Sequence, residues 1–454
     1  MTSASGSQPT QPAPGPPAMG QPLAPVAAPQ RLEAVDILRG FAVLGILVIN
    51  IEFFGLPEAL FFNPSVAGGF EGINYWIWYV GYLLFNSKMM AIFSMLFGAG
   101  LILMHQRAEA AGRPLGRIYY RRLLWLFLIG MIHAYLLWYG DILVSYALCG
   151  LIIYLFRRRS ALLLAILGII ILSIGGGLLF GSSLMMEYLR DTADKVEQAK
   201  EAGEEITQTE RQLAQAWEEA SEGFAYRPEK MAEEAEAYRG GFIDALEHRF
   251  PQALMMQTQG FFFMVLWRVL GLMLLGMALM KWRVFSAERS SGFYTGMVIV
   301  GYGLGLPAVW YGMTLMEQQG FDFVAQFGLG GQFNYFFSVV VALGHTGLVM
   351  IAIKHGWLRW LSERLRAAGR MALTNYLMQT VICTTLFYGY GFGLFNHLDR
   401  MYLALIVAAI WIIQLSYSPL WLRHYRFGPA EWLWRSLTYR RRQPMKVEHQ
   451  NQAS

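Results

Sequence analysis

Long uninterrupted blocks of apolar residues restrict the fold of this chain more than any other feature. A run of about 18 or more apolar residues is long enough to cross a bilayer core of roughly 30 Å. Hydrophobic residues make up 55% of the 454 positions and charged residues only 15%, a balance that a soluble protein of this length would not need. The sequence therefore predicts an all-α, polytopic integral membrane protein whose first partner is the lipid bilayer.

Ten apolar segments have the length and composition of transmembrane helices. Between the first two lies Asn74 to Phe85, which carries Trp76, Trp78, Tyr79 and Tyr82, aromatic residues of the kind that favour the headgroup level, so we predict an interfacial helix there. The predicted spans are Ile37–Phe54, Met89–Met104, Leu123–Tyr139, Ile142–Phe156, Ala161–Phe180, Gly260–Met280, Gly292–Leu315, Phe333–Ile353, Met371–Phe392 and Met401–Leu420.

Basic residues predict how these spans are oriented. Clusters of arginine and lysine follow the second, fourth, sixth, eighth and tenth spans, whereas the alternate loops hold almost none. Because cytoplasmic loops are enriched in Lys and Arg, this pattern places both termini in the cytoplasm. We expect a multi-pass protein of the bacterial inner membrane.

One acidic, polar insert interrupts the apolar blocks at about residues 184–253. From Glu187 to Arg249 it holds 17 acidic and 8 basic residues, a net charge of −9, so the rest of the chain carries +14 and the whole chain +5. Its Glu, Ala and Gln residues favour helix. The order of the spans predicts that this insert is extracytoplasmic, as a solvated spacer or as a lid that guides substrate.

Five regions follow from this pass. They are a disordered Pro/Ala-rich tail at 1–30, a membrane half of five spans at 31–183, the insert at 184–253, a second membrane half at 254–440 and a disordered basic and polar tail at 441–454.

Several classes of partner are not predicted. The basic residues are scattered over many loops, so nucleic-acid binding is not expected. Cys149 and Cys383 lie inside apolar blocks and no Cys/His metal spacing is present, so we predict neither a disulfide framework nor a metal site. No bound cofactor is expected, and the oligomeric state is left open.

Ionisable residues inside spans are costly, and they mark function or a specific buried partner. Asp36 and Arg39 open the first span with a spacing of three, which places them on one helix face. There Arg39 could bind a phosphate while Asp36 orients it, or the two could form a local ion pair. Glu52, near the outer end of the same span, could act as a base or be a solvated carboxylate.

His133 and Asp141 form the pair that most resembles a catalytic one. His133 lies inside the third span, and Asp141 lies in a short turn after Gly140. An imidazole can take a proton from an attacking hydroxyl, and a carboxylate can fix its tautomer. In one continuous helix, eight residues would separate them by about 12 Å, so the pair forms only if Gly140 breaks the helix. His133 could otherwise be a packing residue with one hydrogen bond.

Arg268 is a lone guanidinium deep in the sixth span, where it needs a partner or a water-filled cavity. It could bind an anion or pair with Asp141 or Glu52. Asn375, Tyr376 and Gln379 share one face of the ninth span, where they could line a polar cavity or hold helices together.

Several strings together resemble the YeiB family. They are Arg31–Asn50, Phe93–Gly100, Gly140–Leu143, Gly369–Gln379 and Phe427–Arg435. The resemblance covers about residues 31 to 440 and implies around ten spans.

The YeiB family is in turn similar to transmembrane acyltransferases, among them bacterial acyltransferase family three and heparan-α-glucosaminide N-acetyltransferase. The shared Asp-x-x-Arg-Gly start is Asp36 to Gly40 here. This resemblance implies transfer of an acyl group from cytoplasmic acyl-CoA to a glycan across the membrane. Better-known members use a histidine in or after the first span. This chain has none from Ile37 to Met104, so His133 would take that part.

Three functions remain open at this point. An acyltransferase would use Arg39 for the CoA phosphates, His133 with Asp141 as the base, and Arg268 or Asn375 for the oxyanion. A transporter or exporter of a small molecule would use Arg268, Asp141 and His133 as a proton-coupled site. A sensor or assembly protein would use the insert as its partner surface.

Overall fold

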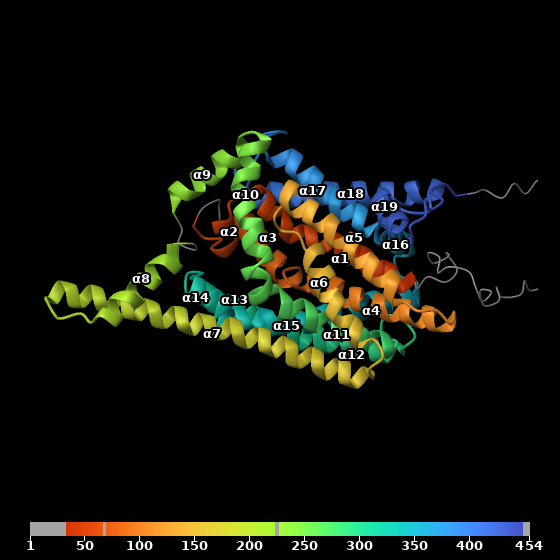
Figure 1. Cartoon of the computed structure of the whole chain (residues 1–454), viewed down its shortest axis with the longest axis horizontal. Helices are drawn as coiled ribbons and strands as arrows, with labels where there is room; N and C mark the ends of the chain where they lie inside the picture. Colours follow the sequence, from red (N-terminus) through yellow and green to blue (C-terminus); the bar gives the residue numbers. More distant parts are fainter. Residues whose placement is uncertain (1–32, 67–69, 223–226, 448–454) are drawn as a thin grey trace, which may run out of the picture.

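The computed structural model describes residues 33–66, 70–222 and 227–447, and this part of the chain is helical throughout (Figure 1). It contains no β-strand within those ranges, only an isolated bridge between Tyr425 and Lys446. Helix α1 begins at Glu33 at the end of the bundle that also carries α16 and α19, which we call the terminal end. Helices α9 and α10 lie at the other end, which we call the insert end.

Within the described residues, eight helical segments are long and apolar enough to cross a membrane. Three of them contain a π-helical turn, named η2, η4 and η5. The segments are α1 (Glu33–Gly55), α3 with α4 (Gly72–Leu84 and Lys88–Ala110), α5 with η2 (Gly116–Ile132 and His133–Leu137), α7 (Ala161–Ala202), η4 with α11 (Phe261–Val265 and Leu266–Lys281), α12 with η5 and α13 (Ser291–Val300, Gly301–Gly305 and Leu306–Gln318), α15 (Leu329–His355) and α18 (Arg400–His424).

The remaining elements are shorter, and they explain why eight candidates replace the ten predicted spans. The predicted fourth span is α6 (Leu143–Ile153) with the 3-10 turn η3 (Tyr154–Phe156), and the ninth is α17 (Ala372–Phe387), only 16 residues long. The others are α2 (Glu58–Phe62), α8 (Gln208–Glu222), α9 (Pro228–Arg239), α10 (Phe242–Gln257), α14 (Phe323–Phe327), α16 (Arg359–Arg370) and α19 (Pro429–Tyr439).

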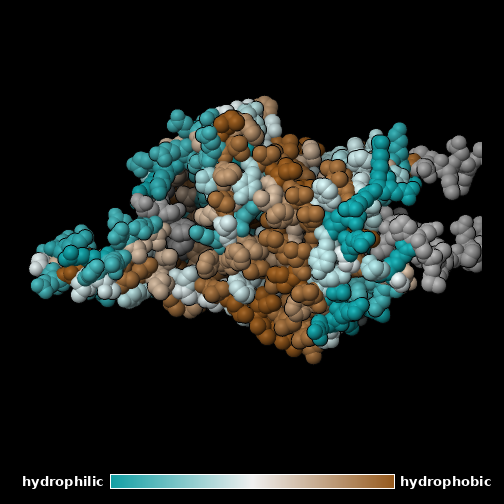
Figure 2. All heavy atoms as spheres, in the orientation of Figure 1, coloured by the Kyte–Doolittle hydropathy of each residue, from teal (hydrophilic) through white to brown (hydrophobic). Residues whose placement is uncertain are grey.

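The surface separates into an apolar middle and two polar ends. Figure 2 shows hydrophobic side chains across the middle of the molecule and hydrophilic ones toward the terminal end and over the insert. Large apolar side chains stay exposed along α7, for example Leu162, Ile169 and Leu184. Exposed apolar helix faces of this extent fit a lipid environment, so the chain is a multi-pass membrane protein.

Helix α7 joins the predicted fifth span to the insert without a break. Ser160 caps its start, since its hydroxyl accepts a hydrogen bond from the Leu163 amide at 3.3 Å. Its 42 residues make it about 63 Å long, roughly twice the thickness of a bilayer core. The predicted boundary at residue 184 therefore falls within one continuous helix.

Close contact between α4 and α11 forms the centre of the bundle. A Cβ atom on Gly276 of α11 would overlap the carbonyl oxygen of Met95, and one on Gly98 of α4 would overlap that of Met273. Small residues let two membrane helices approach this closely. The contact fixes the relative positions of Lys88 on α4 and Arg268 on α11.

Helices α9 and α10 are docked onto the insert end of the bundle. Tyr238 of α9 is buried against Tyr388 and Phe395, and its carbonyl accepts a hydrogen bond from the Gly389 amide at 2.8 Å. Both carboxylate oxygens of Glu234 lie 3.3 Å from the amide of Glu58. Burial, together with the nearby Glu58, raises the pKa of Glu234 to about 8.

Candidate functional site

The chain unwinds between α5 and α6, and this break brings Asp141 back to His133. Helix α5 ends in the π turn η2, Trp138 is extended at φ −161° and ψ 126°, and α6 starts at Leu143. Gly130 leaves the space for the returning carboxylate, because a Cβ atom there would lie 2.9 Å from Oδ1 of Asp141. The break that the pair required is present, although it begins before Gly140.

His133 is held from both sides. Its Nδ1 lies 2.8 Å from Oδ2 of Asp141, and its Nε2 lies 2.9 Å from the hydroxyl of Thr380 on α17. The side chains of His133 and Asp141 are 1% and 0% exposed. The second oxygen of Asp141 accepts a hydrogen bond from the amide of Val144 at 2.9 Å, at the start of α6. An ionised Asp141 places the proton on Nδ1 and leaves Nε2 as an acceptor for the hydroxyl.

The insert contributes to this site through Arg249 of α10. This fully buried guanidinium donates to the carbonyl of Leu136 at 2.5 Å and to that of Tyr135 at 3.4 Å. Both carbonyls belong to the π turn that starts at His133. A cation at the C-terminal end of a helix is favourable, so Arg249 stabilises the break that carries the histidine.

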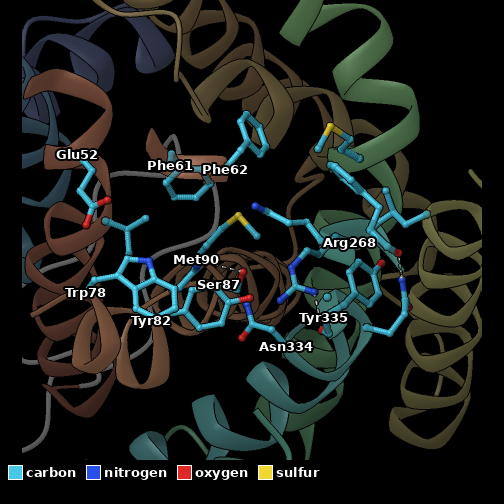
Figure 3. Close-up of a pocket in the computed structure, with 18 residues that line it drawn as sticks. Glu52, Phe61, Phe62, Trp78, Tyr82, Ser87, Met90, Arg268, Asn334 and Tyr335 are labelled. Carbon is cyan, nitrogen blue, oxygen red and sulfur yellow. Dashed lines mark hydrogen bonds between the residues drawn. The ribbon is translucent and has the colours of Figure 1, made fainter. Parts of the chain in front are cut away.

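A cavity of about 260 Å³ lies between α1, α3, α4, α7, α11 and α15. Figure 3 shows Arg268 and Tyr335 on one side of it and Glu52 and Trp78 on the other. Most of its walls are apolar or aromatic. The lining residues are Ile49, Glu52, Phe61, Phe62, Trp78, Tyr82, Asn86, Ser87, Met90, Leu179, Met264, Arg268, Gln326, Phe327, Gly331, Gln332, Asn334 and Tyr335.

Two cations are buried at this cavity. Arg268 donates to the carbonyl of Tyr335 and the hydroxyl of Ser338, each at 2.7 Å. Lys88 lies behind the wall, where its ammonium donates to Asn334 Oδ1 at 2.7 Å and to the carbonyl of Tyr82 at 2.9 Å. All these acceptors are uncharged.

Glu52 does not pair with Arg268. Its carboxylate lies 3.6 Å from Nε of Arg400 on α18, and Arg400 also donates to the carbonyl of Leu60 at 3.2 Å. The structure therefore places two of the predicted binding residues, Glu52 and Arg268, at one cavity but with different partners.

The other predicted residues lie elsewhere in the bundle. Asp36 and Arg39 form the local ion pair, at 2.7 Å. Asn375 and Gln379 connect α17 to α18 through Ser418 and Gln414, which is the helix-holding role that their spacing allowed. Tyr376 faces the other way, and its ring centre lies 5.1 Å from that of His133.

Three residues of these sites were not singled out from the sequence. Lys88 closes the polar string Asn86-Ser87-Lys88, just outside the span predicted to begin at Met89. Thr380 is one turn beyond Tyr376 on the same α17 face, a spacing that could have suggested it. Arg249 gave no local signal, because its partners lie more than a hundred positions away.

Comparison with known proteins gives a consistent family. Residues 279–441 match the family described as "Protein of unknown function (DUF418)". The chain is 32% identical over 432 residues to the uncharacterized protein YeiB of Escherichia coli (strain K12), across 90% of this chain and 97% of that protein. It is 31% identical over 436 residues to the uncharacterized protein YxaH of Bacillus subtilis (strain 168), across 93% and 98%.

A third relative is more distant. It is an uncharacterized 39.9 kDa protein in the amylase 3′ region of Bacillus acidopullulyticus, 26% identical over 448 residues and matched across 93% of this chain and 98% of its own length. No solved structure matches the chain.

Proposed function

This chain belongs to the YeiB family, and we propose that it is an enzyme that transfers an acyl group from cytoplasmic acyl-CoA to a hydroxyl acceptor, such as a glycan, across the inner membrane. The observation that carries the proposal is His133, held between Asp141 and the hydroxyl of Thr380 at 2.8 and 2.9 Å. An imidazole oriented by a carboxylate and bonded to a hydroxyl is the arrangement that activates hydroxyls in acyl transfer.

In the proposed step, the acceptor hydroxyl takes the place of the Thr380 hydroxyl at Nε2 of His133. The acceptor oxygen attacks the thioester carbonyl and its proton passes to Nε2, while Asp141 stabilises the imidazolium that forms. The carbon–sulfur bond then breaks, and the CoA thiolate leaves with the proton from His133. The products are an ester and CoA.

The terminal end offers a site for the CoA phosphates. Asp36 holds Arg39 there at 2.7 Å. Arg122 lies close enough to Arg39 and to Arg435 for its charge to interact with both. Guanidinium groups bind phosphates well, so the basic side of the bundle suits a cytoplasmic donor.

The test uses protein purified into lipid nanodiscs and supplied with acetyl-CoA, with release of the CoA thiol as the readout. We expect slow turnover by the wild-type chain and none by H133A or D141N. H345Q is the matched control, because His345 is also buried and bonded on both sides, to Tyr302 and to the Leu84 carbonyl. Turnover by H133A at the wild-type rate would contradict the proposal.

A second function, transport of a small anion, is supported by one separate observation, the cavity with Arg268. Uptake into proteoliposomes driven by a proton gradient, without release of CoA from acyl-CoA, would favour transport over acyl transfer. Uptake also depends on how the chain is oriented in the membrane, and we propose that both termini lie on the cytoplasmic side.

A further inference from the structure

Among the described residues, no opposite charge pairs with either of the two cations at the cavity. Arg268 is 6% exposed and Lys88 is 0% exposed, so both charges are removed from water. Four uncharged groups accept their hydrogen bonds, and the Nε of Arg268 has no hydrogen-bond partner among the described residues. A buried charge in a membrane protein is retained with a partner or for a function. The nearest lining carboxylate, Glu52, is already paired with Arg400.

We propose that this cavity binds the oxyanion of a ligand, a carboxylate or a phosphate, at Arg268. The guanidinium presents a planar set of donors that matches such an oxyanion, and its Nε is still available to donate. Lys88 adds a second positive charge directly behind Tyr82 and Asn334. The proposal goes beyond acyl transfer, since it concerns binding at a second place in the bundle.

The walls indicate what accompanies the oxyanion. Phe61, Phe62, Trp78, Met90 and Met264 present apolar surface to the cavity. Its volume of about 260 Å³ exceeds the roughly 150 Å³ of an apolar cavity known to hold benzene. A ligand with an apolar portion would therefore bury it here, which makes an anionic amphiphile the best match.

The partners of Lys88 are uncharged although its side chain is fully buried. A buried ammonium group without a carboxylate partner is costly, because an uncompensated buried charge is strongly destabilising. Asn334 occupies the position at which an aspartate of nearly the same shape would provide that charge. The bundle thus keeps a positive potential at the cavity at a cost in stability.

The test measures binding by native mass spectrometry and by calorimetry in nanodiscs of zwitterionic lipid, without acyl-CoA. The probes are decyl phosphate, decanoate, inorganic phosphate and decanol. We expect both charged amphiphiles to bind at least tenfold more tightly than decanol. Inorganic phosphate distinguishes the two sources of the oxyanion, because equal affinity for it would indicate a soluble anion and weaker affinity a lipid.

Variants locate the binding. K88M and R268Q should weaken binding of decyl phosphate at least tenfold, and K281M, which removes a charge from the terminal end of the same helix α11, should leave it unchanged. H133A should bind normally, so a failure of acyl transfer leaves this inference intact. Decanol binding as tightly as decyl phosphate would overturn the proposal, and so would wild-type affinity in both K88M and R268Q. The selectivity of the wild-type chain decides the matter even if a variant does not fold.

Discussion

The His133 cluster and the Arg268 cavity are both polar sites in an apolar bundle, but their charges are matched to different extents. At His133, both ring nitrogens and both oxygens of Asp141 have partners between 2.8 and 2.9 Å away. At the cavity, two cations share four neutral acceptors. A complete network orders its members, whereas an unbalanced charge creates a potential that a ligand can neutralise.

The comparison separates chemistry from binding. The His133 cluster is closed, so its role depends on the orientation of one imidazole. The cavity is lined with apolar and aromatic side chains and surrounds Arg268, so its role depends on net charge. Substitutions at the two sites should therefore change the stability of the protein by different amounts, and N334D at the cavity should raise it whereas H133A should lower it.

The largest effect is expected from D141N. An asparagine keeps the shape but can donate to Nδ1, which stabilises the wrong tautomer of His133. We expect acyl transfer to fall about 10³- to 10⁴-fold, by analogy with the same change in other His–Asp pairs. Thiol release from acetyl-CoA measures the loss. A decrease of less than tenfold would remove the histidine from the proposed chemistry, and decyl phosphate binding serves as the control that should not change.

The next effect concerns stability at the same cluster. H133A removes the Nδ1 donor from the buried carboxylate of Asp141, and loss of a hydrogen bond to a buried charged group costs more than the roughly 1–3 kcal/mol of an unsatisfied neutral group. Thermal unfolding in nanodiscs should show a clearly lower midpoint than for H345Q. An unchanged unfolding midpoint would contradict the prediction that the contact between His133 and Asp141 stabilises the protein.

A smaller effect is expected where α4 meets α11. G276A places a methyl group against the backbone of Met95, and overpacking of this kind costs about 1–3 kcal/mol. Since these two helices carry Lys88 and Arg268, G276A should weaken anion binding. The distances from His133 to Asp141 and Thr380 should stay the same. G303A is a control on α12–α13, because nothing lies within 4 Å of a Cβ atom there. Equal losses in the two variants would contradict this reading of the contact.

The smallest effect is a pH dependence of the stability of the insert. The pKa of Glu234 is raised to about 8 by burial and by Glu58. A raised carboxyl pKa means that the docked state binds the proton more tightly, so docking of α9 is strongest at low pH and weakens as the pH rises through about 8.

Hydrogen exchange of α9 amides at about pH 6 and about pH 9, corrected for the chemical rate, measures this docking. E234Q keeps an acceptor for the Glu58 amide without the charge, and should show a smaller change of docking with pH, because burial also raises the pKa of Glu58. Faster exchange of α9 in the wild-type chain at the lower pH would contradict the sign of the effect.

Much of the fold could be predicted from apolar blocks alone, because a membrane span is a local property of the sequence. Four long helices overlap apolar segments that were predicted as spans, namely α1, α7, α15 and α18. The short fourth span was predicted at Ile142–Phe156, which α6 and η3 confirm. The shortness of α17 was not predicted, since the helix ends at Phe387 inside a segment that is apolar up to Phe392. The predicted boundary at residue 184 follows a change from apolar to polar composition. Helix-favouring residues continue across that change, so the fifth span and the start of the insert form one helix.

The sites were predicted only where one segment contains both partners. Asp36 with Arg39 and His133 with Asp141 are three and eight positions apart, so a helix or a break between helices sufficed to propose them. Lys88 with Asn334 and Arg249 with Leu136 are 246 and 113 positions apart. Such pairs follow from tertiary packing, which leaves no spacing in the sequence.

The most direct test of the contrast between the two sites is N334D, measured for both thermal stability and anion affinity. The new carboxylate would give Lys88 an opposite charge in nearly the same geometry. We expect a more stable protein, by about 0.5–2 kcal/mol, that binds decyl phosphate at least tenfold more weakly than the wild type. A variant that is less stable, or one that binds the anion as tightly as before, would contradict it.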